Sequence, residues 1–422
     1  MGGIYIHIPF CTSHCTYCGF YSELLPRRGS ERVCCSEGAR LDGYVDALCT
    51  EIRLSGALDG MGGGFDNNAG PTAGGCAKVE TLYIGGGTPS VLSVAQIGKI
   101  VRALDGSFQL RLGEFTVEVN PDDIVRGGKD YAAGLRSIGV SRVSMGIQSF
   151  DDKVLRRMGR RHNAAQAAQA YRILQECGFD NISVDIIFGF EAQWDVETVR
   201  NGLLNLSGDH AEHGDLSGLP RHISCYQLSV EEGSGLEKMI AKGLYSLPDD
   251  ETCAAQYSAL CKMLASMGYE HYEVSNWALP GYRSRHNSSY WNHSPYLGLG
   301  PAAHSLIISQ KADSQQYTRR WNKPDTAAYV SAMKRIDGAC LPEAKAILAG
   351  IRGYETLTAE QVREEKVMLG LRTAEGIDPG LVPPASPSSA LLEKTCPENP
   401  NGRLRIPEDR WFISDSIIAD LI

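Results

Sequence analysis

Residues 3–20 of the chain read GIYIHIPFCTSHCTYCGF. The run Gly3–Ile8 is rich in β-branched and aromatic residues and predicts a β-strand. Cys11, Cys15 and Cys18 follow it directly, in the spacing C-x3-C-x2-C. A loop just beyond a strand can wrap three thiolates around one compact object. This stretch therefore predicts both the first strand of the fold and the place of a site on it.

Beyond this stretch, short β-rich runs alternate with helical stretches as far as Leu228. Six such βα units predict a parallel sheet with right-handed crossovers, either doubly wound or curved into a partial barrel. Strands are expected at Gly3–Ile8, Thr81–Ile84, Glu114–Val119, Arg142–Ile147, Asn181–Phe188 and His222–Leu228, and helices at Leu41–Leu58, Val94–Leu104, Tyr131–Ile138, Ala164–Cys177, Val196–Leu204 and Asp249–Met267.

Polar or flexible residues stand at the carboxyl ends of most of these strands. Active sites of α/β barrels gather at that end, where the loops converge on one mouth. The shared position favours the barrel, so we expect an α/β fold with a partial (β/α)6 TIM-like barrel and a small, mainly α C-terminal domain. The residues concerned are Gly85–Gly87, Glu118, Gln148, Asp185 and the pair Tyr226 and Gln227.

The 422 residues, 43% of them hydrophobic and 22% charged, fit a folded protein with a large core. We expect a core barrel over residues 1–240, a barrel-completing segment over 241–323 and a C-terminal domain over 324–422. The stretches Gly56–Gly75 and Ser207–Gly218 are expected to be flexible surface insertions.

Charge and hydropathy argue against two function classes. Fifty acidic residues against 41 basic ones give a net charge of -9, which argues against a nucleic acid partner. No apolar run approaches the roughly 18 residues that span a bilayer, so an integral membrane protein is not expected. The N-terminus also lacks the basic segment and apolar core of a signal peptide. We therefore expect a cytoplasmic protein.

The chain has thirteen cysteines, and ten of them show no ligand spacing. These ten are expected to be small buried or incidental residues. For Cys11, Cys15 and Cys18, zinc would normally require a fourth ligand, which the neighbouring sequence does not supply apart from His7 and His14. Three thiolates can instead bind three irons of a 4Fe-4S cluster and leave the fourth iron open. The spacing favours the cluster, with zinc or a redox thiol group as alternatives.

The cysteine spacing, with Tyr17 before the third cysteine, resembles the radical S-adenosylmethionine superfamily. The resemblance implies that the open iron chelates the amino and carboxylate groups of S-adenosylmethionine, which an electron from the cluster then cleaves. Independently, Gly85–Gly87 would let the backbone approach a ligand closely. In the superfamily, the residues that match the following positions line this cofactor: Tyr5, Gly87, Thr88, Glu118, Gln148, Arg160 and Asp185.

Further motifs along nearly the whole chain resemble the coproporphyrinogen dehydrogenase/HemW group within that superfamily. One departure is Gly189-Phe190-Glu191, where the group usually has Gly-Leu-Pro. The matching motifs are Tyr5–Cys11, Gly85–Ser90, Glu118–Pro121, Ser144–Phe150, Asp185–Gly189, Tyr269–Asn276 and Met368–Thr373.

The group has two branches, an oxygen-independent coproporphyrinogen III dehydrogenase and a heme chaperone. The dehydrogenase has a fourth cysteine where this chain has Phe20, and a long extension before the first cysteine, where this chain has ten residues. The segment Ser284–Trp291 contains H-N-x-x-Y-W, which resembles the heme-binding motif of the chaperone branch, with His286 at the histidine. Imidazole is a common axial ligand of heme iron.

The resemblance therefore implies a monomeric or dimeric heme chaperone with a 4Fe-4S cluster and S-adenosylmethionine. It would bind heme through His286 and deliver it to a membrane-associated acceptor hemoprotein, and the resemblance implies a link to respiratory cytochromes. The alternative is radical oxidative decarboxylation of coproporphyrinogen III propionates in heme biosynthesis. RNA-modifying radical enzymes share the cysteines, but the acidic balance argues against them. The sequence leaves open the electron donor, the cleavage of S-adenosylmethionine and whether heme is attached covalently.

Overall fold

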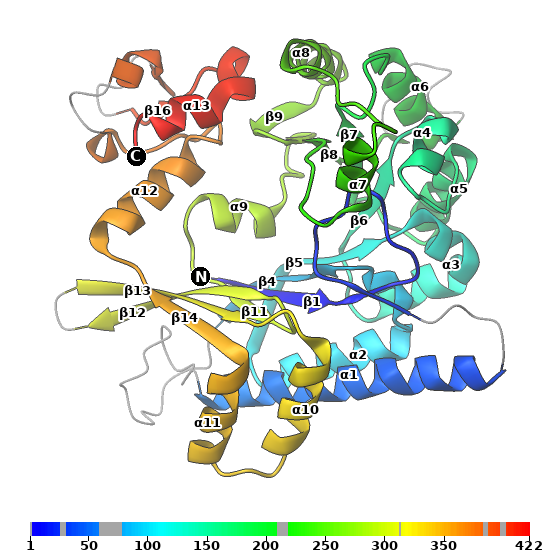
Figure 1. Cartoon of the computed structure of the whole chain (residues 1–422), viewed down its shortest axis with the longest axis vertical. Coiled ribbons are helices and arrows are strands. Elements are labelled where there is room, and N and C mark those ends of the chain that lie inside the picture. The colour runs from blue at the N-terminus through cyan, green and yellow to red at the C-terminus, as the bar shows by residue number, and fades with distance from the viewer. Residues whose placement is uncertain are drawn as a thin grey trace.

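The structure is a computed structural model that describes residues 2–25, 31–58, 78–208, 218–311, 314–382, 387–396 and 402–422. Its centre is a nine-stranded sheet in the order β11-β1-β4-β5-β6-β7-β8-β10-β9 (Figure 1). All neighbours from β11 to β8 are parallel, and β10 is antiparallel to both β8 and β9. The strands are β1 (Gly3–Ile8), β4 (Lys78–Gly86), β5 (Gln109–Val119), β6 (Arg142–Gln148), β7 (Ile182–Phe188), β8 (His222–Gln227), β9 (Glu270–Glu273), β10 (Asn276–Ala278) and β11 (Leu297–Leu299).

The helices that connect the parallel strands cover the outer side of the sheet, whereas α9 lies on the other side (Figure 1). Several begin with a side-chain cap; Ser93 and Asn163, for example, form capping boxes at the starts of α2 and α5. The helices are α1 (Glu31–Leu58), α2 (Val94–Asp105), α3 (Pro121–Ser137), α4 (Asp152–Arg157), α5 (Ala164–Glu176), α6 (Val196–Ser207), α7 (Gly235–Ala241), α8 (Asp250–Ser266) and α9 (Arg285–Trp291).

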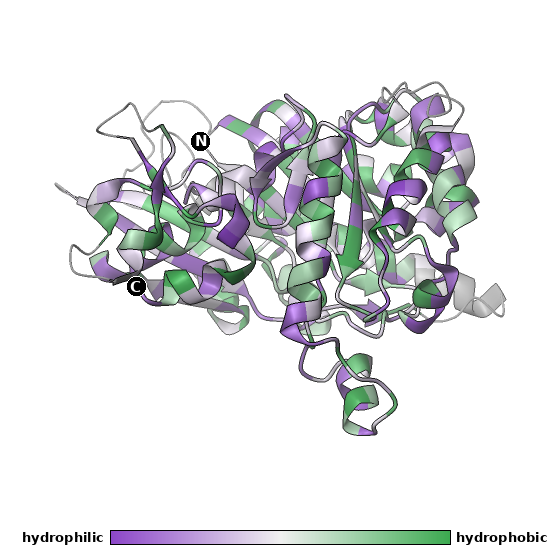
Figure 2. Ribbon diagram, turned by 90° about the horizontal axis from the view of Figure 1, so that it is seen from above, coloured by the Kyte–Doolittle hydropathy of each residue, from purple (hydrophilic) through white to green (hydrophobic). Residues whose placement is uncertain are grey.

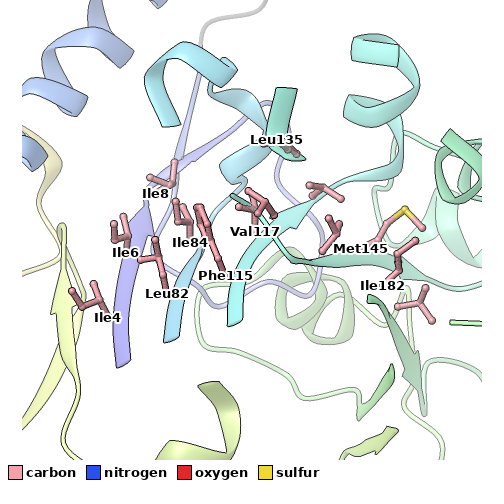
Figure 3. Packing of buried hydrophobic residues seen from close by; sticks show 14 of the residues in the cluster. Ile4, Ile6, Ile8, Leu82, Ile84, Phe115, Val117, Leu135, Met145 and Ile182 are labelled. Carbon is pink, nitrogen blue, oxygen red and sulfur yellow. The ribbon is translucent and has the colours of Figure 1, made fainter. Parts of the chain in front are cut away.

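The apolar core lies between these helices and the sheet. Alternate strand residues such as Ile6, Leu82 and Val117 are fully buried on that side, as Figure 3 shows. In Figure 2 the central part of the ribbon includes apolar, green segments, and the helices around it carry both green and purple segments. Because side chains alternate along a strand, the residues between these apolar positions point to the opposite, inner face.

The structure confirms the α/β fold and the six expected βα units. The nine-stranded sheet keeps β11 and β9 as its two edges, so it is a partial barrel. The sequence did not predict β9, β10 and β11, which extend the sheet at both edges. Helix α1 begins at Glu31, ten residues before the expected start.

The C-terminal part packs against the barrel and is mainly helical. Strand β14 pairs with β13, so one three-stranded sheet contains residues from both sides of the expected boundary at 323. The division into residues 1–240, 241–323 and 324–422 stays a prediction. The elements are β12 (His304–Lys311), β13 (Ser314–Asn322), α10 (Thr326–Ile336), α11 (Leu341–Ile351), β14 (Arg352–Thr356), α12 (Ala359–Gly370), β15 (Glu393–Lys394), β16 (Leu404–Arg405) and α13 (Ser414–Ala419).

A buried ion pair joins the barrel to the C-terminal part. Glu51 of α1 accepts hydrogen bonds from Arg352 of β14 at 2.8 Å and from the Tyr329 hydroxyl of α10 at 2.7 Å. The Gly300 N–H and the Asn322 amide donate to the same carboxylate, each at 2.8 Å. Burial opposes ionisation of Glu51, but Arg352 and these donors outweigh it and lower its pKa.

Two expected features lie largely outside the described residues. Most of the insertion Gly56–Gly75 falls in 59–77 and most of Ser207–Gly218 falls in 209–217. Separately, none of the helices in the described ranges combines the length and apolar character that crossing a membrane requires.

Candidate functional site

The inner face of the partial barrel is polar. On β5, Glu114, Thr116 and Glu118 alternate with the apolar residues of the outer face, and the other strands follow the same pattern. Strand register places side chains from neighbouring strands at the same level; Glu118 of β5, for example, is beside Ser144 of β6. The sheet thus lines a polar interior on one side while it forms the apolar core on the other.

A pocket of about 510 Å³ opens at the carboxyl ends of the strands. It has the size of a small-molecule site. Of the eleven residues predicted from the sequence, nine line it, whereas Tyr5 and His286 do not. The nine are Cys11, Cys15, Cys18, Gly87, Thr88, Glu118, Gln148, Arg160 and Asp185.

The three cysteines lie on a loop that the neighbouring chain holds in place. The Thr16 N–H donates to the Met158 carbonyl at 3.0 Å, and the Leu236 N–H donates to the Thr16 carbonyl at 2.6 Å. All three thiols are free. Burial raises the pKa of Cys11, and that of Cys18 to about 11.

The glycines at the end of β4 and just after it allow the chain to pass very close to the cysteine loop. Gly86 has a φ of +111°, and a Cβ there would lie 2.6 Å from Nδ1 of His7. A Cβ on Gly87 would lie 2.8 Å from the Phe10 carbonyl oxygen and 3.1 Å from Sγ of Cys11. Only glycine fits this approach, as the sequence indicated.

Glu118 and Asp185 are the two carboxyl groups that the pocket brings together. Glu118 accepts hydrogen bonds from the Tyr83 hydroxyl at 2.7 Å and from the Gly86 N–H at 3.1 Å. Burial and the nearby Asp185 raise the pKa of Glu118, to about 7, against the opposing effect of these donors. Burial also raises the pKa of Asp185, which accepts from the Ser144 hydroxyl at 3.2 Å.

Gln148 and Arg160 approach the pocket from the end of β6. Gln148 has a φ of 72°, which is uncommon for a residue other than glycine and is typical of functional positions. Arg160 donates to the Gly146 carbonyl and to Oδ1 of Asn120, each at 2.6 Å, and to Sγ of Cys15 at 3.4 Å. Its Nε is buried without a hydrogen-bond partner.

This donor set fits the cofactors that the sequence implies. Among the described residues, no three histidine, cysteine or acidic side chains are placed to hold a single metal ion. The three thiols line a common pocket without converging on one point, which suits a cluster better than mononuclear zinc. The unpartnered Nε of Arg160 and the two carboxyl groups offer polar partners to a zwitterionic ligand beside them.

Tyr5 lies on the inner face of β1 and does not reach the pocket. Its hydroxyl is 3.0 Å from Nδ1 of His7, and its ring is 6.1 Å from that of Tyr83. In this arrangement Tyr5 packs beside Tyr83, which donates a hydrogen bond to Glu118. A contact between Tyr5 and the cofactor stays a prediction.

His286 lies inside the barrel, near the amino ends of β1 and β4. It is 1% exposed, and its Nδ1 and Nε2 lie 2.9 Å and 2.8 Å from the hydroxyl oxygens of Thr81 and Tyr290. Its ring stacks on Tyr83, 5.1 Å away, and burial, with a smaller effect of Arg142, lowers its pKa to about 3. Both ring nitrogens are therefore engaged, and iron ligation would require Nε2 to leave Tyr290.

Glu114 of β5 fixes the helix that carries His286. Its carboxylate accepts from the backbone N–H groups of Arg285 at 3.0 Å and His286 at 2.9 Å. These are first-turn amides of α9, which need such an acceptor. The neighbouring Asn287 reaches the pocket lining, so the H-N-x-x-Y-W segment borders the pocket even though its histidine does not.

The pocket contains functional candidates that the sequence did not single out. Tyr83 and Asn120 hold Glu118 and Arg160, and Arg142 lies deeper in the lining. Asn120 was within a matching motif, and Arg142 is a charged residue at the start of a predicted strand. These two signals were present in the sequence, but neither shows which way the side chain points.

The motif Tyr269–Asn276 contains a buried carboxyl group with no charged partner among its hydrogen bonds. Glu273 is 0% exposed and accepts from the Asn276 amide and from the Ser275 N–H. Burial raises its pKa to about 8, with a smaller opposing effect of the Ser275 N–H.

Glu273→Gln is expected to change the pH dependence of stability. The carboxyl group keeps its proton to about pH 8 in the folded chain and to roughly pH 4.3 in the unfolded chain. The wild type should therefore lose stability relative to the variant as the pH rises between these values, by up to about 1.4 kcal/mol per pH unit. Denaturant unfolding at pH 5, 6, 7 and 8 measures this. Parallel pH profiles for the two proteins would contradict it.

Comparison with known proteins agrees with this geometry. Residues 73–199 match the profile of the Radical SAM superfamily. The chain is 32% identical over 379 residues to the heme chaperone HemW of Mycobacterium tuberculosis (strain CDC 1551 / Oshkosh), covering 89% of this chain and 82% of that protein. It is also 32% identical to the bovine (Bos taurus) mitochondrial radical S-adenosyl methionine domain-containing protein 1, covering 89% and 74% of the two chains.

A solved structure shows the same fold. The coproporphyrinogen III oxidase HemN from Escherichia coli, described as a radical SAM enzyme, superposes with a TM-score of 0.69 at 20% identity, covering 99% of this chain and 89% of that one. The barrel and its cysteine loop thus have the architecture of a radical SAM protein. The chain belongs to the HemW family of that superfamily.

Proposed function

We propose that the chain is a heme chaperone that holds a 4Fe-4S cluster, S-adenosylmethionine and heme, and passes heme to an acceptor hemoprotein. One observation carries the proposal: a single pocket extends from the three cysteines to Asn287 in the H-N-x-x-Y-W segment. The names of the relatives that cover most of the chain support it. In this proposal the chain works in the cytoplasm, and the acceptor is a membrane-associated respiratory hemoprotein.

The pocket residues would have separate tasks in this proposal. Cys11, Cys15 and Cys18 would hold the cluster, which with S-adenosylmethionine supplies one-electron chemistry when bound. Arg160, with its free Nε, would receive the carboxylate of the second cofactor. Glu118, Gln148 and Asp185 would bind its ammonium and hydroxyl groups. Gly87 and Thr88 would let the backbone lie against this cofactor. Tyr5 would help to position Glu118 through Tyr83.

Heme ligation through His286 would require a local rearrangement of α9. The imidazole is buried and its Nε2 is engaged by Tyr290. The lowered pKa keeps the ring neutral, which is the form that ligates iron. Release of the Tyr290 contact would expose Nε2 while Glu114 still holds the start of the helix.

An anaerobic heme titration tests the ligand. His286→Ala is expected to weaken heme binding at least tenfold and to alter the Soret band. Tyr290→Phe is expected to strengthen binding, because it frees Nε2 and keeps the ring. His304→Ala serves as the control, since this histidine is exposed and lies outside the motif. Equal affinity of the wild type and His286→Ala would contradict the assignment.

A second assay separates the chaperone from the decarboxylating branch. Anaerobic incubation with coproporphyrinogen III, S-adenosylmethionine and a reductant is expected to yield no protoporphyrinogen. Pigment analysis after oxidation measures this, and a turnover product would replace the proposal with oxygen-independent coproporphyrinogen III dehydrogenase.

A further inference from the structure

Arg142 is a buried cation in the interior of the barrel. It is the first residue of β6 and lies in register with Thr116 of β5, which places its side chain on the polar inner face. The residue is 1% exposed, and yet it belongs to the lining of the pocket. Its guanidinium is therefore shielded from bulk solvent and faces the ligand space.

This guanidinium lacks the partners that a buried arginine usually has. Its Nε is buried with no hydrogen-bond partner. Within the described ranges, no hydrogen bond or ion pair involves the guanidinium, although its charge attracts the Asp185 carboxylate and opposes the rise of its pKa. An arginine has five N–H donors and stays charged. A buried charge of this kind is normally paired, so the position calls for an anionic partner from outside the chain.

Arg142 and Arg160 stand at different depths of the pocket. Arg160 donates to the carbonyl of Gly146, at the carboxyl end of β6 beside the cysteine loop. Arg142 begins the same strand, four residues earlier, which corresponds to about 13 Å along the strand. The two cations therefore start from different levels of β6, and the pocket has a second cationic position beyond the one assigned to S-adenosylmethionine.

The surroundings of Arg142 connect it with the H-N-x-x-Y-W segment. Arg142 contributes to the lowered pKa of His286, and Asn287 lines the same pocket. The ring of Tyr83 stacks on His286 and its hydroxyl donates to Glu118. An anion bound to Arg142 would thus lie between two parts of the pocket. One part holds Glu118 and Asp185, the carboxyl groups proposed to bind the cofactor, and the other is the H-N-x-x-Y-W segment.

We propose that Arg142 binds a propionate carboxylate of the porphyrin that enters the pocket. This proposal rests on the proposed heme chaperone function and adds a residue that binds the propionate-bearing edge of the macrocycle. A guanidinium and a carboxylate form two parallel N–H···O bonds, which fix orientation as well as affinity. Arg283 beside the motif is a weaker position, because it is exposed and already paired with Glu270 and Glu375.

Iron-free protoporphyrin IX and its dimethyl ester test this without iron ligation. The holoprotein, with cluster and S-adenosylmethionine, is titrated anaerobically with each pigment by fluorescence. Wild type is expected to bind the free acid at least tenfold more tightly than the ester. Arg142→Gln should lose this preference with little change in ester affinity, Arg142→Lys should keep part of it, and Arg283→Gln should keep all of it.

Several outcomes would overturn the proposal. Equal affinity of the wild type for the free acid and the ester would contradict the proposal. This comparison needs no variant, so it remains decisive even if Arg142→Gln does not fold. Loss of the preference in Arg283→Gln, or an Arg142→Gln protein that keeps the preference and loses S-adenosylmethionine binding, would also contradict the proposal. If the wild type binds heme but binds the free acid and the ester equally well, only this inference fails. If the wild type binds neither heme nor porphyrin, the proposed chaperone function fails, and this inference fails with it.

Discussion

Cys15→Ala protein, reconstituted anaerobically, is expected to contain far less than the roughly four irons and matching sulfide of a 4Fe-4S cluster. Cys15 lies between the other two cysteines on the loop and contacts Arg160, so its loss opens the middle of the thiolate set. The same result is expected for Cys11→Ala and Cys18→Ala. Iron and acid-labile sulfide analysis, with the visible absorption spectrum, measures it.

A matched control separates cluster loss from general damage. Cys340→Ala removes an exposed thiol at the start of α11, far along the chain from the pocket. It should reconstitute like the wild type. Wild-type protein that binds one zinc in place of the cluster, or a Cys15→Ala protein with full iron and sulfide, would refute the cluster assignment and the cofactor pocket with it.

Arg352→Met is expected to destabilise the fold by about 3–5 kcal/mol, because it leaves the Glu51 carboxylate buried without its cation. Both side chains are almost fully buried, at 3% and 0% exposure. The pair joins α1 to β14, and Tyr329 of α10 shares the carboxylate. Loss of the pair should therefore loosen the C-terminal part from the barrel. Denaturant unfolding measures the loss of stability, and one spectroscopic probe in the barrel and a second in the C-terminal part show whether the two parts unfold separately.

The double variant Glu51→Gln with Arg352→Met provides the contrast. It removes both charges and should recover much of the lost stability. Arg200→Met breaks an exposed pair with Glu197 and should change stability far less. An Arg352→Met protein as stable as the wild type would show that the buried pair contributes nothing.

The sequence predicted the parallel core because its apolar strands and helices are locally distinctive. It missed β9, β10 and β11, which are only three or four residues long; β10 pairs with β8, β9 pairs with β10, and β11 pairs with β1. Such edges depend on distant partners, and no local pattern marks them. The start of α1 was predicted ten residues too late, at Leu41, because the first ten residues of the helix contain few apolar residues at helical intervals.

The same distinction holds for the site. Loop residues next to strand ends, such as Gly87 and Thr88, could be assigned from position because parallel strands end at one mouth. The burial of His286 could not be predicted, since it follows from the docking of α9 on Glu114 and Tyr83. Arg142 was missed for a similar reason, because its place in the pocket lining depends on how β6 pairs with β5.

Strand β1 pairs with β4 on one side and with β11 on the other, although residues 297–299 are synthesised almost 300 residues later. On the ribosome, one hydrogen-bonding edge of the first strand therefore stays open through most of translation. Open strand edges invite pairing with other chains. Chains that terminate before Leu297 should consequently aggregate during expression.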